Sequence, residues 1–328
     1  MQSPKMETEY TNGVIAVREK YLLKEKLARL CELNAEEAFR MLLDSGYGGG
    51  AEVATSVYDY EKLIAVEEEK LDAFILEYAP NEAIAAYLLA PRDFHNAKAC
   101  VKAAFLGEDA TKLLAPKGII LVELIRSCVE SGNFKPLGEY IPALQTACEQ
   151  ATALLETEPS GAKVGVIFER ALYGYLAEKV RYNRVLRDLL NKKVDMTNIL
   201  TALRAGEEKI ALDKYLPIGY LNSKQLSALF ESDSEKVIKS FAGTEYCEFV
   251  KLCLQAKEKK QPFTQAEKLL GGIEAAYFAR RKYDLQKNQP FLYYAYRRRA
   301  ENANVRIAFA CLLAGLSETE IKARLRAL

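Results

Sequence analysis

The stretch Asp93-Phe94-His95-Asn96-Ala97-Lys98 places an acid and an asparagine three positions apart, and the chain repeats this arrangement twice more. In each copy the pair is followed by an apolar run and then by a glycine. The three copies are Asp93 and Asn96 before Gly107, Asp195 and Asn198 before Gly206, and Glu301 and Asn304 before Gly315. Because successive acids are about one hundred residues apart, the spacing predicts that one structural unit occurs three times.

A comparison of two more distant segments supports the repeat. Residues 27–47 align without gaps with residues 226–246, so that apolar positions match apolar positions and Tyr47 matches Tyr246. A shorter middle copy is recognisable at residues 124–140. We therefore predict three related helical units, at residues 1–112, 113–213 and 214–328.

The composition and the spacing of apolar residues favour helix. Half of the residues are hydrophobic, and only 10 prolines and 18 glycines occur among 328 residues. Apolar positions recur at helical steps over residues 54–78, Asn34 and Glu37 have the spacing of a capping box, and a short helix is expected at residues 81–90. Since no stretch shows the alternation typical of strands, we predict an all-α fold.

Two joints are expected to interrupt the helices. Pro116-Lys117-Gly118 follows the first acid–asparagine copy, and Pro217-Ile218-Gly219 follows the second. Proline fixes φ and glycine permits a positive φ, so each triplet predicts a break between helices at an equivalent place in the repeat.

Charge and cysteine usage exclude several classes of protein. The formal net charge of +1 gives the chain no bulk attraction for nucleic acid or for an anionic membrane. No apolar run reaches membrane-spanning length, and nothing resembles a signal peptide, so we expect no transmembrane segment. The seven cysteines are scattered without a CxxC spacing, which is typical of buried thiols in a reducing cytoplasm.

The sequence contains no recognisable catalytic constellation. His95 is the only histidine, so histidine-based triads and multi-histidine metal sites are excluded. We interpret His95 as a packing or hydrogen-bonding residue at a helix start, with a proton-linked switch as the alternative. The glycines at 48–50 form no phosphate loop, and Glu67 and Glu69 are expected on an exposed face. We predict a non-enzyme without cofactor or metal.

Two basic triplets leave more than one interpretation open. They are Arg280-Arg281-Lys282 and Arg297-Arg298-Arg299. Consecutive helical residues point about 100° apart, so neither triplet makes a flat basic patch. Solvated helix surface with local ion pairs is the simplest interpretation. Docking to an acidic partner is the alternative, and nucleic acid fits least well because the domain is not basic overall.

The acid–asparagine pairs also have two interpretations. In one, Asp93 and Asp195 are helix N-caps and the asparagines hydrogen-bond the preceding loop. In the other, each pair faces a common axis, where it fixes packing or lines a polar cavity. The segment from Arg297 to Ala314 is expected to be uninterrupted helix, which argues against a capping role for Glu301.

At these motifs the chain resembles the C subunit of bacterial and archaeal V/A-type ATPases, whose counterpart is the d subunit of eukaryotic V-ATPases. The resemblance covers nearly the whole chain. It is carried by residues 93–98, 217–221 and 301–306, and by the final stretch 310–328, where Ser317 and Glu320 form a capping box. The family usually has a second acid two residues before the position of Glu301, where this chain has Arg299.

The resemblance implies a non-catalytic rotor adaptor. Such proteins are funnels of three helical units arranged pseudo-threefold around a central cavity. One end would sit on the proteolipid ring at the cytoplasmic face of the membrane, and the cavity would receive the central shaft. We expect one copy in each complex and a monomer in isolation, with no nucleic acid bound. The alternative is an all-α repeat scaffold that binds an unrelated protein partner.

We predict that the three motifs and their neighbours line the cavity or a docking surface, because they recur three times. The candidates are Asp93, Asn96, Asp195, Asn198, Arg299, Glu301, Asn304 and Arg306.

Overall fold

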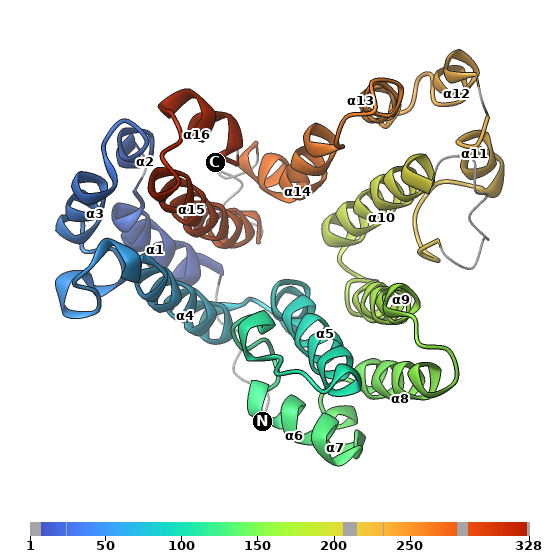
Figure 1. Cartoon of the computed structure of the whole chain (residues 1–328), viewed down its shortest axis with the longest axis horizontal. Coiled ribbons are helices and arrows are strands. Elements are labelled where there is room, and N and C mark those ends of the chain that lie inside the picture. Colours follow the sequence, from blue (N-terminus) through green and yellow to red (C-terminus); the bar gives the residue numbers. More distant parts are fainter. Residues whose placement is uncertain (1–7, 24, 206–214, 232, 281–287, 327–328) are drawn as a thin grey trace. The chain divides into compact units, whose positions relative to one another are not determined.

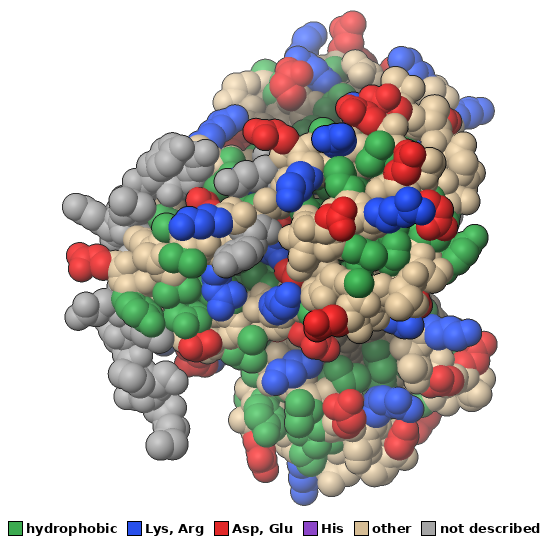
Figure 2. All heavy atoms as spheres, turned by 90° about the vertical axis from the view of Figure 1, so that its left-hand side faces the viewer, with side chains coloured by type: hydrophobic (Ala, Val, Ile, Leu, Met, Phe, Trp, Pro, Cys, Tyr) green, Lys and Arg blue, Asp and Glu red, His purple; other side chains and the backbone are tan. Residues whose placement is uncertain are grey.

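The computed structural model describes the chain except for residues 1–7, 24, 206–214, 232, 281–287 and 327–328. Within the described residues every regular element is an α-helix or a 3-10 helix, and no strand occurs, so the all-α prediction is confirmed. In the same part of the chain no helix is long and apolar enough to cross a membrane. Figure 2 shows acidic and basic side chains interspersed over one face, in keeping with the small net charge.

The helices gather into two compact units. Unit 1 combines both ends of the chain, residues 1–85 and 274–328, and unit 2 is residues 86–273. The chain passes between the units within α5 (Glu82–Leu106) and within α14 (Thr264–Ala279). This division follows contacts, whereas the three predicted units follow sequence repeats, and the three-unit division stays a prediction.

Unit 1 is built around one long helix near the C-terminus. That helix, α15, spans Gln289–Leu313 and packs against α4 and α1 from the other end of the chain (Figure 1). Its other helices are α1 (Thr8–Arg18), α2 (Glu25–Leu30), α3 (Ala35–Asp44), α4 (Tyr60–Tyr78) and α16 (Glu318–Arg324). The core joins Val305 and Phe309 of α15 to Phe39 of α3 and to Leu63 and Ile64 of α4, all of them buried.

Unit 2 contains two further long helices, α5 and α10 (Arg184–Ala205). Besides a 3-10 helix at Thr111–Leu113 and the first part of α14, it contains α6 (Val122–Ser131), α7 (Lys135–Gly138), α8 (Pro142–Thr157), α9 (Gly161–Lys179), α11 (Ser223–Ala228), α12 (Ser234–Ser240) and α13 (Cys247–Glu258). One core joins Ile199 and Leu203 of α10 to Val237, Phe241 and Val250 of the short helices that follow. In both units a long helix therefore packs with shorter helices: α10 with those that follow it, and α15 with those near the other end of the chain.

The structure confirms several local predictions and corrects others. Asn34 caps α3 by accepting a hydrogen bond from the Glu37 amide, and Ser317 and Glu320 form the expected capping box. The expected helix at 54–78 begins later, at Tyr60, after a 3-10 turn. The prediction of a short helix at 81–90 is wrong, because α5 continues through Pro91 to Leu106.

The continuity of α5 follows from its burial. A proline inside a helix removes one backbone hydrogen bond but need not end the helix when neighbouring turns are held by packing. Ile84, Leu88 and Leu89 before the proline, and Phe94 and Ala97 after it, are all buried. His95 therefore lies inside a helix and not at its start.

Candidate functional site

Three acid–asparagine clamps, one on each long helix, are the recurrent polar feature of the described chain. A clamp is defined here as the acid and the asparagine three residues later, together with the backbone segment that they bind. All six side chains are at most 3% exposed. Buried polar groups of this kind must be hydrogen-bonded, and the bonds show what the motif does.

The first clamp lies on α5. Asn96 pairs with both backbone groups of Ala115: its Oδ1 accepts the Ala115 amide at 2.8 Å, and its Nδ2 donates to the Ala115 carbonyl at 3.1 Å. Asp93 accepts the amides of Ile119 and Ile120 at 2.8 and 3.0 Å. The pair thus fixes the irregular segment that leads into α6.

The second clamp, on α10, repeats this geometry. Asn198 pairs with the amide and the carbonyl of Leu216 at 3.0 and 3.2 Å. Asp195 accepts the amides of Tyr220 and Leu221 at 2.9 and 3.1 Å, and the hydroxyl of Tyr246 at 2.6 Å. The bound segment leads into α11. In both clamps the acid binds two consecutive amides. These amides lie four and five residues after the residue that the asparagine binds.

The third clamp, on α15, reaches to the other end of the chain. Asn304 pairs with the amide and the carbonyl of Arg326 at 2.7 and 3.0 Å, as in the other two clamps. Glu301, however, accepts the amide of Leu23 at 2.6 Å, 278 residues away, in the segment that leads into α2. Each long helix therefore holds the entry to a cluster of short helices, and the third holds the entry to the first cluster.

The two Pro-x-Gly joints are explained by the approach of the carboxylates. A Cβ atom at Gly118 would lie 2.5 Å from the Asp93 carboxylate oxygens, and one at Gly219 would lie 2.3 Å from an Asp195 oxygen. Gly219 also has a φ of +126°, which side chains rarely adopt. Glycine is required at both places because the carboxylate occupies the side-chain position.

The third clamp contains a buried cation that the other two lack. Arg298 is ion-paired to both Glu301 and Glu67, and Glu67 also binds Lys70 at 2.8 Å and accepts the Gly48 amide at 3.0 Å. The side chains of Arg298, Glu67 and Glu301 are all less than 10% exposed. Breaking such a pair leaves an uncompensated charge in a medium of low polarity.

Burial raises the pKa of all three acids. The pKa of Asp93 rises to about 6, because loss of hydration outweighs the two amide hydrogen bonds that favour the anion. Burial also raises the pKa of Asp195, opposed by the hydrogen bonds from Tyr246 and two amides. The pKa of Glu301 is raised by burial as well, and there the positive charge of Arg298 opposes the shift.

The structure tests the first of the two interpretations of the acid–asparagine pairs. The N-cap interpretation of Asp93 and Asp195 is wrong, because both lie in the interior of α5 and α10. The asparagines bind the segment that follows the helix and not the segment before it. Arg297 to Leu313 is continuous helix, as expected.

The remaining candidates lie outside the clamps. Arg306, 42% exposed, pairs with Glu61 at 2.9 Å and with Glu68 at 3.5 Å, and Arg299 is half-buried. That the eight candidates line a cavity or a docking surface stays a prediction. His95 is exposed, and its Nε2 lies 2.8 Å from the Leu113 carbonyl oxygen, in keeping with a hydrogen-bonding role.

Sequence reasoning missed or misplaced several of these groups. Glu67, expected on an exposed face, is buried, and Arg298, expected in a basic surface triplet, is buried as well. Arg281 and Lys282 of the other triplet fall outside the described residues. The role of Tyr246 was missed, although its alignment with Tyr47 was a signal: the Tyr47 hydroxyl donates to Asn302 of α15 at 2.7 Å.

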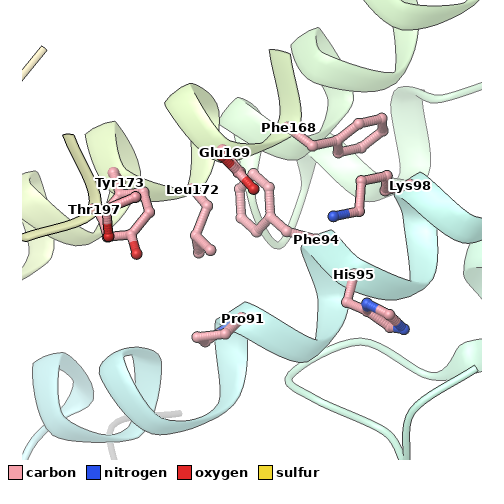
Figure 3. A pocket seen from close by; sticks show the side chains of 9 residues that line it. All are labelled: Pro91, Phe94, His95, Lys98, Phe168, Glu169, Leu172, Tyr173 and Thr197. Carbon is pink, nitrogen blue, oxygen red and sulfur yellow. The ribbon is translucent and has the colours of Figure 1, made fainter. Parts of the chain in front are cut away.

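A pocket of about 260 Å³ lies in unit 2 among α5, α9 and α10 (Figure 3). Its walls are mainly aromatic and aliphatic, and Lys98 and Glu169 point into it, whereas His95 points away toward the loop after α5. Among the described residues no group of His, Cys, Asp or Glu is arranged to hold a metal ion. The six buried cysteines and the half-buried Cys247 are free thiols.

Comparison with known proteins gives two matches. The family model described as ATP synthase (C/AC39) subunit matches residues 11–324, nearly the whole chain. The C subunit of a V-type sodium ATPase from Enterococcus hirae is 26% identical over 153 residues. That match covers 44% of this chain and spans 44% of the relative's length.

Proposed function

Because this chain belongs to the ATP synthase (C/AC39) subunit family, we propose that it is the rotor adaptor of a V/A-type rotary ATPase, coupling the central shaft to the membrane proteolipid ring. The family is that of a non-catalytic subunit, so the chain is not itself the catalytic unit. In this role it transmits torque during ATP-driven ion transport or ion-driven ATP synthesis.

The observation that carries the proposal is the repeated clamp. A torque adaptor must resist shear between its parts, because any slack between helices is lost rotation. In each of the first two clamps, buried side chains on the long helix make four or more hydrogen bonds to main-chain atoms. Main-chain atoms cannot move away by a change of rotamer, so these connections are stiff. Close-packed helices joined in this way transmit strain with little compression.

The third clamp supports a closed arrangement of the three predicted units. In this arrangement the long helix of each predicted unit binds the entry to the next predicted unit. The first predicted unit has no unit before it, and its entry is bound instead by Glu301 of the third, through the amide of Leu23. We propose on this basis a pseudo-threefold funnel whose cavity receives the shaft and whose other end rests on the ring. One copy would act in each complex, at the cytoplasmic face of the membrane, and the isolated chain would be a monomer.

Direct docking is assigned to the more exposed candidates. The six clamp side chains are occupied by the chain's own backbone, and they act by fixing the segments around them. Arg306 is the candidate for a partner contact, because its guanidinium lies at the surface between Glu61 and Glu68. Substitution Arg306→Glu is expected to weaken assembly with shaft or ring, and a melting curve checks that the variant, which loses the ion pairs with Glu61 and Glu68, is folded.

The test is recovery of the complex from the native membrane. A tagged full-length chain is expected to co-purify with the shaft proteins and, in mild detergent, with the proteolipid ring. Lys163→Glu, an exposed charge reversal in unit 2, is the control for Arg306→Glu. Recovery of neither shaft nor ring, from a preparation that retains ATP-driven ion transport, would refute the proposal. Recovery of an unrelated protein instead would favour the scaffold alternative.

A further inference from the structure

The turn between α9 and α10 concentrates positive charge. Taken with the adjoining ends of the two helices, it comprises residues 179–187, which contain four basic side chains and no acid in a chain whose formal net charge is only +1. We call the exposed part of this turn the turn patch. It consists of Arg181, Tyr182, Arg184 and Arg187, all exposed.

The turn patch is held in a fixed conformation. Val180 and Leu186 are fully buried and anchor the turn on both sides. The Asn183 amide donates to the Val180 carbonyl at 2.8 Å, and Asn183 Oδ1 accepts the Leu186 amide at 3.2 Å. Because the backbone is fixed, binding has to order only the exposed side chains and not the turn itself.

The arginines of the turn patch keep their charge available. Within the part of the chain that the structure describes, none of the three guanidinium groups is ion-paired to a carboxylate. Arg187 donates to the Arg181 carbonyl at 2.9 Å, which brings the two residues together. The acid that follows the turn, Asp188, instead accepts the Tyr220 hydroxyl at 2.6 Å and lies 3.7 Å from Lys192.

An exposed aromatic ring completes the patch. Tyr182 is 87% exposed, and the Arg181 guanidinium lies 4.6 Å from the centre of its ring. Tyrosine is enriched where protein meets the membrane–water interface, because the ring has an apolar body and a polar tip. Arginine binds phosphate oxygens in a bidentate manner.

From this combination we propose that the turn patch binds the phosphate headgroups of an anionic phospholipid surface. Three exposed guanidinium groups without carboxylate partners, beside one exposed ring, match the phosphates and the interfacial region of an anionic lipid surface. An acidic peptide would be held better in a groove, and the pocket of unit 2 is lined by other residues. The proposal concerns lipid and is independent of the coupling role proposed above.

The proposal is tested by flotation of the full-length chain with vesicles. Phosphatidylcholine vesicles with added phosphatidylglycerol are expected to bind the chain at low salt, and phosphatidylcholine alone is not. The triple variant R181Q/R184Q/R187Q is expected to bind about one hundredfold more weakly, because each basic residue near an anionic surface strengthens binding by about fivefold. Added salt is expected to weaken binding of the unmodified chain.

A matched control separates this patch from charge in general. K257Q/K259Q/K260Q removes three exposed positive charges at the end of α13, in the same unit, and is expected to change binding by about twofold or less. Tyr182→Ser is expected to reduce binding several-fold while preserving its dependence on salt. Circular dichroism melting curves check that each variant is folded.

Three results would overturn the proposal. They are failure of the unmodified chain to bind phosphatidylglycerol vesicles at low salt, equal losses for the two triple variants, and tighter binding to polyglutamate than to vesicles of equal charge.

Discussion

The clamp of unit 1 and the two clamps of unit 2 each use an acid and an asparagine, but over very different distances along the chain. In unit 2 the acid holds a segment that follows closely, as when Asp195 binds Tyr220, 25 residues later. In unit 1 Glu301 holds Leu23, 278 residues earlier, and adds the buried cation Arg298. The comparison shows that one local motif can serve either as a short connection or as the closure of the chain's two ends.

The largest expected difference lies in the acids themselves. Glu301→Ala leaves Arg298 with one partner fewer and the Leu23 amide without an acceptor, and should lower the free energy of unfolding by about 3–5 kcal/mol. Asp195→Ala leaves only neutral donors unpaired and should cost about 2–3 kcal/mol. Urea unfolding of the full chain measures both. Glu301→Gln, which keeps an acceptor for Leu23, should fall between them, and a smaller loss for Glu301→Ala than for Asp195→Ala would contradict the comparison.

The pH dependence of stability tests the protonation of the acid in the first clamp. The pKa of Asp93 is about 6 in the folded chain against 3.8 ordinarily, so the folded chain favours the protonated acid. The resulting contribution to the free energy of unfolding is complete below pH 4 and is lost as pH rises through 6. The loss should reach about 3 kcal/mol at most, since each pKa unit corresponds to about 1.4 kcal/mol. Urea unfolding at pH 4 to 7 should show this fall, and Asp93→Asn should flatten it. An unchanged slope in that variant would show that Asp93 does not titrate in this range.

The joints of unit 2 can be tested by adding one methyl group. Gly118→Ala would press its Cβ against the buried Asp93 carboxylate and should lower the free energy of unfolding by about 2 kcal/mol. Gly165→Ala, in α9 with open space around it, is the control and should be neutral or stabilising by up to about 1 kcal/mol. Thermal unfolding of the two variants compares them directly. Equal melting temperatures would mean that the carboxylate can withdraw from the joint.

The smallest effect distinguishes two equivalent tyrosines. The Tyr246 hydroxyl donates to a carboxylate, and the Tyr47 hydroxyl donates to the neutral amide oxygen of Asn302. Hydrogen bonds to charged groups contribute more, so Tyr246→Phe should cost about 1 kcal/mol more than Tyr47→Phe. Paired urea titrations of the two variants measure the difference, and equal losses would contradict the expected contrast between the charged and the neutral acceptor.

The sequence predicted the fold class and the recurrence of the motif, because apolar periodicity and spacing are local signals. It did not predict what the acids and the asparagines bind. A backbone amide has no residue identity, so Ala115, Leu216 and Arg326 share no signature. Gly118 and Gly219 were a sequence signal of these contacts, since a close carboxylate excludes a side chain at both positions. The ion pair of Arg298 with Glu67 joins residues far apart in the chain, and neither residue marks its partner.

The bond between Glu301 and Leu23 also orders events during synthesis. Unit 2 comes from one continuous stretch, so the residues of its core are made together, whereas α2, α3 and α4 are made about two hundred residues before the α15 helix that covers them. At ordinary elongation rates their apolar faces wait roughly tens of seconds for the helix that buries them. We therefore expect the nascent amino-terminal helices to be the stretch that chaperones shield until α15 has been made.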